Sequence, residues 1–571
     1  MSSADWFILI AYLVGTVLIG VLLGRLVRNS SDFFNAGSRS PWWMSGLSAF
    51  MTMFSANTFV VWGGVAFKHG LVAVMINLMY GVAALLAGYF VAGRWKELGV
   101  KTPAEFVEKR FGPAALHFYT WFMMTLRIVG SAGALYAIAR LIVALTGGNE
   151  ASLATLNLAI LIFGVVIVIY TMIGGLGAVL MTDVLQFIIL NLAILFVIPL
   201  TLMKMGSPVE AFRNAPEGFF APTAGPDYSW FFLVGWLAIH YFMIGAEWAF
   251  VQRYLCVPTA RDARKSTYLF GVLYLVSPFL WLAPPFLWRL KNPIPEGAGA
   301  AEVKVLAENA YILSCKAVLP SGMVGLMMAA MFSATASMIS SQLNVFSGVL
   351  AHDIYRRFRP LASDRNLIAA GRVFTILLGG FIVLFAMGIP YLGGAEKVIV
   401  SVTELMVVPL LAPCLWGLFN RRLPTAALWA TVGICFPLGI FVRFIMPAGS
   451  EGLAGWVAGH SKQVETFIGV VLPLIITALS IRLARHDSPG WQAVAALQGQ
   501  ATDDAPPPAP ASNLPARIVG WSMAACSLLM ASLIPINPGS RVSLAVFTAL
   551  LAAISAIIFR ASRTRSHPAV P

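Results

Sequence analysis

The chain has 571 residues, of which 59% are hydrophobic and 11% are charged, whereas soluble domains are about 45–50% apolar and about 25% charged. This composition excludes an ordinary water-soluble enzyme and predicts an all-α integral membrane protein in a lipid bilayer. Lysine and arginine number 38 against 24 aspartate and glutamate residues, a net charge of +14. Membrane proteins concentrate basic residues in their cytoplasmic loops, so this excess does not call for nucleic acid, and we expect no such partner.

About fifteen stretches have the length of a membrane-spanning helix, which needs about 20 predominantly apolar residues. They cover residues 6–25, 43–66, 70–93, 115–145, 153–172, 177–203, 229–250, 268–288, 322–350, 368–388, 396–418, 425–446, 464–481, 517–535 and 541–559. With the N-terminus outside, about 25 of the 38 basic residues fall in inner loops, as the positive-inside rule requires. We therefore expect a multi-pass protein of a bacterial-type plasma membrane, with the N-terminus outside and the C-terminus cytoplasmic.

The order of these stretches predicts five parts. They are an extra helix with the first cytoplasmic loop (1–40), a central core (41–425), two additional helices (426–486), a linker (487–515) and a terminal hairpin with a basic tail (516–571). The linker is rich in proline, alanine and aspartate, and such segments bury too little apolar surface to fold. We expect it to be disordered, and no stretch remains that is large enough for an attached kinase or ATPase.

Two of the stretches carry small and polar residues at a depth where a spanning helix should be apolar. The second contains Asn57 and Thr58, and the seventh ends near Glu247 and Trp248. Each opens a block of five stretches, 43–203 and 229–418. Broken helices at corresponding positions of two halves are typical of transporters built from inverted repeats, with a binding site at the bilayer midplane. The alternative is that the small residues only allow close helix packing.

Charged residues inside the apolar stretches are candidate site residues, because a buried charge in a membrane is costly and normally faces water, a partner or a ligand. Glu247 has His240 two helical turns before it on the same face, so the two could bind a polar solute, relay a proton or pair structurally. Arg127 could bind an anion or serve as the partner of a carboxylate. Asp183 could attract a cation leaving toward the cytoplasm, or cap the start of its helix.

The ninth stretch carries hydroxyl groups along much of its length. These belong to Ser333, Thr335, Ser337, Ser340, Ser341 and Ser347. Hard cations take oxygen ligands, so the hydroxyls together with carbonyls freed at the break near Asn57 could bind sodium. The alternative is that they bond to carbonyls of their own helix.

Several motifs give the chain a resemblance to the sodium:solute symporter family, typified by sodium/galactose and sodium/proline cotransporters. The strongest motif runs from Tyr170 through Gly174-Gly175-Leu176 to Thr182-Asp183 and Gln186. Others follow the family order, namely Asp32-Phe33-Phe34, Thr102-Pro103-Ala104-Glu105-Phe106, Gln252-Arg253-Tyr254-Leu255, Leu343-Asn344 and Asp353-Ile354-Tyr355. The resemblance implies a five-plus-five inverted-repeat core like that of the leucine transporter, here with extra N- and C-terminal helices.

The resemblance also implies a sodium site and a solute site. Sodium would be bound by the carbonyls of Met51, Phe54 and Ala334 and by the hydroxyl of Ser337. Met338 stands where the family usually has a second hydroxyl, and thioethers are poor ligands for hard cations. Either Ser333, Ser340 or water supplies the missing oxygen, or sodium coupling is weakened or lost.

The residues at the family's solute-contacting positions are Asn57, Thr58, Asn77, Glu247 and Trp248, with His240 beside them. They differ from the sugar pattern of the galactose-transporting relatives, so the resemblance does not identify the solute. We expect a secondary active symporter, without a cofactor, for sodium and a small polar organic solute such as a sugar. The alternatives are a proton-coupled symporter and a solute sensor on the same fold. No motif of a membrane-embedded enzyme is present.

Overall fold

The computed structural model describes residues 1–25, 29–146, 153–204, 207–392, 395–442, 446, 452–501 and 514–564. Across these residues the chain forms helices and one isolated β-bridge, between Ala224 and Tyr228. In the described part, nine helices are long and apolar enough to cross a membrane, or eleven when each of two bent pairs is one span. The all-α membrane architecture predicted from composition is confirmed.

The longest helix, α9 (Leu153–Lys204), contains two of the predicted spans. Its 52 residues, at about 1.5 Å each, far exceed the roughly 30 Å of a hydrocarbon core. The helix changes direction at Gly175, whose φ of 61° and ψ of −164° are not helical and suit glycine alone. Three more apolar helices are shorter than a usual span, at Leu405–Gly417, Thr425–Ile440 and Arg517–Ala531. The predicted number of about fifteen counts these three and both halves of α9 as spans.

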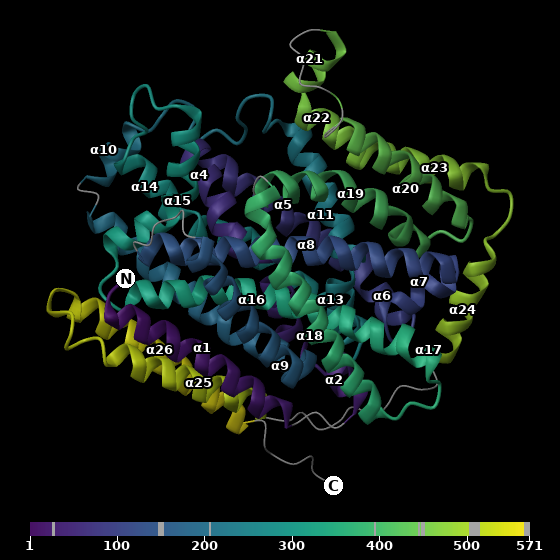
Figure 1. Cartoon of the computed structure of the whole chain (residues 1–571), viewed down its shortest axis with the longest axis horizontal. Helices are drawn as coiled ribbons and strands as arrows, with labels where there is room; N and C mark the ends of the chain where they lie inside the picture. The colour runs from purple at the N-terminus through teal and green to yellow at the C-terminus, as the bar shows by residue number, and fades with distance from the viewer. Residues whose placement is uncertain are drawn as a thin grey trace.

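Both predicted helix breaks are present, and each opens a set of helices. The labelled members of the two sets can be followed in Figure 1. The first joins α3 (Trp42–Met53) to a π-helical turn (Thr58–Trp62) and α4 (Gly63–His69), with a bend of 65°. The second joins α11 (Trp230–Ala246) to α12 (Trp248–Leu255), with a bend of 49°. The first set continues with α5 (Leu71–Ala87), α8 (Pro113–Thr146) and α9. The second continues with α13 (Ala260–Trp281), α16 (Met323–Val349), α18 (Asp364–Gly388) and α19 (Ala395–Gly417).

Helix α16 is the central helix of the bundle. It packs against α1 (Ser3–Gly24), α3, α8, α9 and α18, and 94% of its most apolar stretch is buried. Its start is fixed by Asp5 of α1, whose Oδ1 accepts hydrogen bonds from the amides of Gly322 (2.8 Å) and Gly325 (3.0 Å). The hydroxyl stripe predicted from the sequence therefore lies on a helix enclosed on every side, and the bilayer does not reach it.

The segment 487–515, predicted to be a disordered linker, differs from that prediction over part of its length. Residues Pro489–Ala501 form helix α24, which packs against α7 (Pro103–Phe111), while 502–513 lie outside the described residues. The buried Arg110 of α7 donates to Ser488 Oγ (2.8 Å) and to the carbonyls of Gly417 (3.1 Å) and Leu423 (2.9 Å). Burial lowers the pKa of Arg110 to about 10, so it stays charged at neutral pH and binds α24 to the end of α19.

The remaining helices surround this core. They are α2 (Ser30–Asn35), α6 (Gly93–Glu97), α10 (Pro208–Arg213), α14 (Ala283–Lys291), α15 (Ala300–Val318), α17 (Arg356–Phe358), α20 (Thr425–Ile440), α21 (Gly452–Gly459), α22 (Ser461–Thr466), α23 (Leu472–Leu483), α25 (Leu514–Ala531) and α26 (Arg541–Thr564). The terminal pair α25–α26 forms a hairpin whose first helix packs against α9, so the terminal hairpin predicted from the sequence is attached to the core.

Candidate functional site

The first helix break lies against the middle of α16. Helix α3 ends at Met53, and Phe54 is extended, with φ of −93° and ψ of 137°. The amide of Ala56 no longer bonds along its own helix and donates to Thr335 Oγ1 of α16 (2.9 Å). A hydroxyl of the predicted stripe thus compensates a backbone group released by the break. This is the exchange expected where a membrane helix unwinds beside a polar surface.

The second helix break is at Glu247, which is extended between α11 and α12 with φ of −72° and ψ of 135°. Its carboxylate is 1% exposed, and Arg127 of α8 is 24% exposed. Arg127 Nε lies 3.2 Å from Glu247 Oε1, and Gln342 Nε2 of α16 donates to the same oxygen at 3.2 Å. Arg127 is therefore the partner of a carboxylate, one of the two roles considered for it, and the pair connects α8, the break and α16.

His240 does not pair with Glu247, so the expected Glu–His contact is wrong. Its ring Nδ1 lies 2.8 Å from the carbonyl of Trp236, and its ring is 3.8 Å from the ring of Tyr80, centroid to centroid. Seven helical residues place two side chains on one side of a helix, but the helix ends at Ala246. The backbone turns there and directs Glu247 toward Arg127.

The other predicted solute-contacting residues are Asn77, Trp248, and the pair Asn57 and Thr58 at the first break. Asn77 of α5 is buried, and its Nδ2 donates to the carbonyl of Ala73 (2.8 Å) on its own helix, which packs against α11. Trp248 is fully buried at the second break, and its indole nitrogen has no hydrogen-bond partner among the described residues. Asn57 and Thr58 start the π-helical turn after the first break, where Thr58 Oγ1 accepts from the amide of Ser55 (3.4 Å). Asn57, unlike Thr58, is partly exposed.

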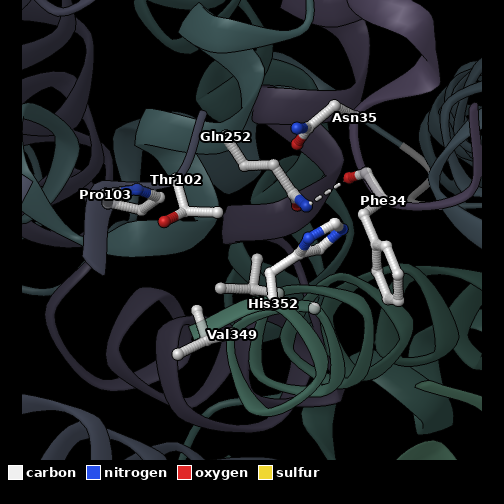
Figure 2. A pocket seen from close by; sticks show the side chains of 9 residues that line it. Phe34, Asn35, Thr102, Pro103, Gln252, Val349 and His352 are labelled. Carbon is white, nitrogen blue, oxygen red and sulfur yellow. Dashed lines mark hydrogen bonds between the residues drawn. The ribbon is translucent and has the colours of Figure 1, made fainter. Parts of the chain in front are cut away.

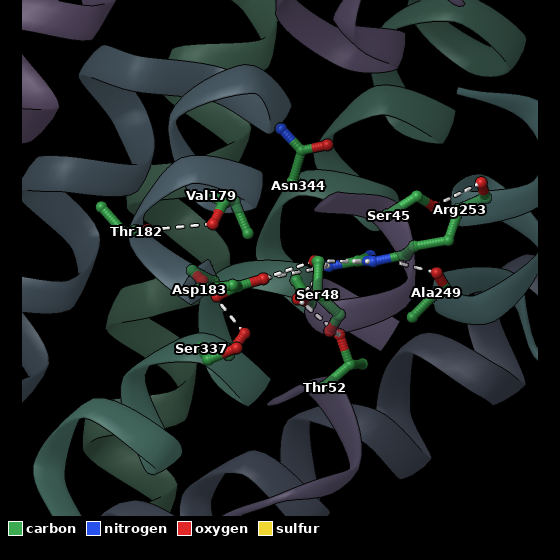
Figure 3. A network of polar contacts seen from close by, with 12 residues as sticks. Ser45, Ser48, Thr52, Val179, Thr182, Asp183, Ala249, Arg253, Ser337 and Asn344 are labelled. Carbon is green, nitrogen blue, oxygen red and sulfur yellow. Dashed lines mark hydrogen bonds and ion pairs between the residues drawn. The ribbon is translucent and has the colours of Figure 1, made fainter. Parts of the chain in front are cut away.

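Asp183 lies in a polar network between α9, α3, α12 and α16 (Figure 3). It is fully buried, it accepts a hydrogen bond from Ser48, and its Oδ2 is 3.9 Å from Arg253 Nη2. Arg253 also donates to Ser48 (3.1 Å) and to Ser341 (2.5 Å). Asp183 follows the bend at Gly175 by more than two helical turns, so the helix-capping alternative for it is wrong.

Two buried oxygens in this network, Asp183 Oδ1 and the hydroxyl of Ser337, lie beside each other (Figure 3) and have no other hydrogen-bond partner in the described part of the chain. A carboxylate oxygen and a hydroxyl that have only each other keep lone pairs free for a bound ion. Both atoms are oxygens, the ligand type that hard cations take. The arrangement therefore suits a small cation between α9 and α16.

The carbonyls implied for sodium belong to the residues at the first helix break and to α16. Met51 O accepts from the amide of Phe54 (3.1 Å) in the last turn before the break. Ala334 and Ser337 are buried in α16, and Met338 is partly exposed. Among the hydroxyls that could replace the one missing at Met338, Ser333 donates to its own helix and contacts Tyr12 of α1.

The other replacement hydroxyl, Ser340, donates to the carbonyl of Ser337 (3.0 Å). This bond keeps it beside Ser337, so it is the better placed of the two.

Three residues of these networks were not singled out as site residues from the sequence, namely Ser48, Gln342 and Arg253. Arg253 was noted only as part of a motif. Its signal is a lone arginine that directly follows an apolar stretch and a broken helix, and the cost of burying such a charge implies a carboxylate partner. Ser48 and Gln342 had no signal of this kind, because a hydroxyl or amide inside a membrane helix commonly bonds to its own backbone.

The comparisons with known proteins agree with this geometry. A family model described as sodium:solute symporter family matches residues 33–433. The sodium/glucose cotransporter of Vibrio parahaemolyticus is 24% identical over 523 residues, 86% of this chain and 93% of that protein. The sodium/sialic acid symporter NanT of Aliivibrio fischeri is 26% identical over 497 residues, 83% of this chain and 92% of that protein.

Among solved structures, a substrate-bound, outward-open Na⁺-coupled sialic acid symporter has a similar fold. Its TM-score is 0.68 at 23% identity, and the alignment covers 84% of this chain and 98% of that one. The match supports the leucine-transporter-like arrangement predicted from the broken helices. Since the family model covers most of the chain, the chain belongs to the sodium:solute symporter family, whose members are membrane transporters and not enzymes.

Proposed function

We propose that the protein couples the entry of sodium, moving down its gradient, to the uptake of a small polar organic solute by alternating access. The observation that carries this proposal is the pair of buried oxygens beside the broken helix α3, Asp183 Oδ1 and Ser337 Oγ, which have no hydrogen-bond partner but each other among the described residues. We propose that sodium enters here with the carbonyls of Met51, Phe54 and Ala334 as further ligands. By the positive-inside rule, the N-terminus lies outside and the C-terminus inside the plasma membrane.

The solute site is proposed at the second break, around Arg127 and Glu247. The two charges neutralise each other, so the site offers hydrogen-bond donors and acceptors with little net charge. The Glu247 carboxylate already has a cationic partner at 3.2 Å, so it gives no reason to expect a cationic solute. Asn57, Thr58, Asn77, His240 and Trp248 are the proposed surrounding contacts. A hydroxylated solute such as a neutral or acidic sugar suits this set, and the relatives are named for glucose and sialic acid.

A proton-coupled alternative rests on the same two oxygens. A proton bound to the Asp183 carboxylate would neutralise its charge in place of sodium, with the Ser337 hydroxyl as its hydrogen-bond partner. Sodium and proton coupling are distinguished by transport in proteoliposomes. We expect uptake of the correct solute to require an inward sodium gradient at equal pH on both sides. Uptake that instead follows a pH gradient in potassium buffer without sodium would contradict sodium coupling.

Candidate solutes can be screened before transport is measured. Melting curves of the purified protein with glucose, sialic acid, other sugars and polyols, each with sodium or potassium chloride, report binding, because a ligand that binds only the folded state raises the melting temperature. Under the proposal, the correct solute stabilises the protein more in sodium than in potassium. A solute that stabilises equally in both salts would show that binding of the two substrates is not coupled.

A further inference from the structure

Three sequence motifs meet at one end of the bundle, although they are far apart in the sequence. Gln252 Nε2 of α12 donates to the carbonyl of Phe34 (2.7 Å) and to Asn344 Oδ1 of α16 (2.9 Å). Asn344 Nδ2 in turn donates to the carbonyl of Phe33 (3.4 Å). All four residues are at least 95% buried. We call Phe33, Phe34, Gln252 and Asn344 the latch, because they join the short helix α2 to both α12 and α16.

Glycines in the surrounding helices α9 and α18 allow close contact with the two phenylalanines of the latch. A Cβ at Gly175, where α9 bends, would lie 2.6 Å from the carbonyl oxygen of Phe33. A Cβ at Gly371 of α18 would lie 2.5 Å from the tip of the Phe34 ring. The two rings meet edge to face at 4.9 Å. The Gly-Gly motif in α9 and the Asp-Phe-Phe motif in α2 are thus two sides of one contact.

A second layer of contacts lies beside the latch. Thr102 Oγ1, at the start of α7, donates to Asp353 (3.2 Å), and Asn35 Nδ2 donates to the carbonyl of Lys101 (3.2 Å). Between the layers is a cavity of about 10 Å³, lined by Phe34, Thr102, Gln252 and Val349 among others (Figure 2). This volume is about that needed for one water molecule, so no organic solute can pass here in the present structure.

The latch joins the elements that must separate if solute is to leave at this end. Gln252 follows Glu247, the centre of the proposed solute site, by five residues, about 7.5 Å along the helix. Asn344 is on α16, the helix that carries the hydroxyl stripe. Lys101, Arg356 and Arg357 are nearby, and cytoplasmic ends carry such lysine and arginine residues; Glu105 and Glu108 lie at the same end, where Glu108 pairs with Arg357.

The geometry points to the latch as the cytoplasmic gate of the transporter: the Gln252 and Asn344 hydrogen bonds hold α2 against α12 and α16 while the site is open to the outside, and they break to release solute inward. This inference rests on the alternating access proposed above. The carboxamide of Gln252 has an acceptor, Oε1, that no described residue uses. The latch therefore keeps one hydrogen-bonding position for water, which eases its opening.

A reporter cysteine at Val349 tests the gate. Val349 is 2% exposed and lines the small cavity, and cysteine is of similar size. Inside-out vesicles carrying V349C are treated with a membrane-impermeant maleimide, and labelling is followed at the peptide level. We expect Q252A and N344A, each added to V349C, to speed labelling about fivefold to tenfold, as the loss of one or two hydrogen bonds would allow.

Controls within the same chain make the result decisive. N191A removes a carboxamide whose Nδ2 donates to its own helix α9 (Phe187 O, 2.8 Å) and whose Oδ1 accepts from Trp281 Nε1 of α13 (3.5 Å). It lies far along the helix from the bend and contacts no latch residue through these bonds, so it should leave labelling unchanged. The native Cys414, fully buried in α19, reports general loosening in the same molecules. Unchanged labelling at position 349 in both latch variants, an equal rise in N191A, or a parallel rise at Cys414 would each overturn the gate.

Adding sodium separates this inference from the proposed function. If sodium binding favours the outward-facing state, it should slow labelling of V349C in the otherwise unchanged protein. Faster labelling in Q252A without any sodium effect would support the gate and contradict sodium coupling. If sodium slows labelling but Q252A and N344A do not change it, the result would support sodium binding and contradict the gate.

Discussion

The bend of α9 at Gly175 gives a quantitative prediction. An L-residue at φ 61° and ψ −164° is in a region almost restricted to glycine, which costs on the order of 1–3 kcal/mol. In Gly175→Ala the new Cβ would also lie 2.6 Å from the carbonyl oxygen of Phe33 and 2.8 Å from its ring, and such overpacking costs about 1–3 kcal/mol more. We therefore expect a loss of about 2–6 kcal/mol, a large part of the roughly 5–15 kcal/mol that stabilises a typical protein.

The matched control is Gly177→Ala, two residues further along the same helix. Gly177 is helical, and a Cβ there meets no atom within 4 Å, so alanine should be neutral or stabilising by up to about 1 kcal/mol. The melting temperature of each variant in detergent is read by fluorescence-detected size-exclusion chromatography after heating. Gly175→Ala should melt several degrees below the parent or give little folded protein. Equal melting temperatures for the two alanine variants would refute the strained bend and its contact with Phe33.

Three further predictions concern the ion site, the solute site and the start of α16. Ser337→Ala should raise the sodium concentration for half-maximal uptake about tenfold, since one ligand is worth about 1.4 kcal/mol; Ser347→Ala, whose hydroxyl bonds to its own helix, should not. Glu247→Gln should cut solute uptake at least about tenfold while the protein stays folded, because the charge facing Arg127 is lost; unaltered uptake of every transported solute would remove Glu247 from the site. Asp5→Ala should lower the melting temperature, since a helix cap lost to alanine is worth about 1 kcal/mol, and unchanged melting would show that the cap adds no stability.

The helix breaks could be predicted from the sequence because their cause is local. Asn57 and Glu247 stand among apolar residues, and each is followed or preceded by small residues that do not hold a helix straight in a membrane. The central position of α16 could not be predicted in the same way from the sequence, because a row of hydroxyls on one helix is compatible with either a packed or a solvated face. The structure shows both uses: Thr335 accepts from the broken segment, while Ser347 bonds to its own helix.

The error at α24 has a different cause. Composition predicts that the proline-rich stretch after it is a poor core former, and that stretch lies outside the described residues. The helix itself needs few apolar contacts. Val494 is 2% exposed, and Ser488 just before the helix accepts from the buried Arg110. That arginine lies more than 370 positions earlier in the chain. The local composition of residues 487–515 contains no information about a contact with a residue so far away in the sequence, so it could not predict this docked helix.

The charge pair at the second break shows how a distant contact can still be inferred. Arg127 and Glu247 lie on different helices and share no local spacing, yet each would be costly in a membrane without an opposite charge. Asp183 has the same requirement, and Arg253 meets it at 3.9 Å. Matching each membrane-embedded carboxylate to an arginine would therefore have predicted both pairs before the structure. It would also have shown that Glu247 needs no histidine partner, and that a cation bound at Asp183 must share this carboxylate with Arg253. Sodium and the guanidinium then compete for one anion, so we expect the contact between Arg253 and Asp183 to weaken when sodium binds.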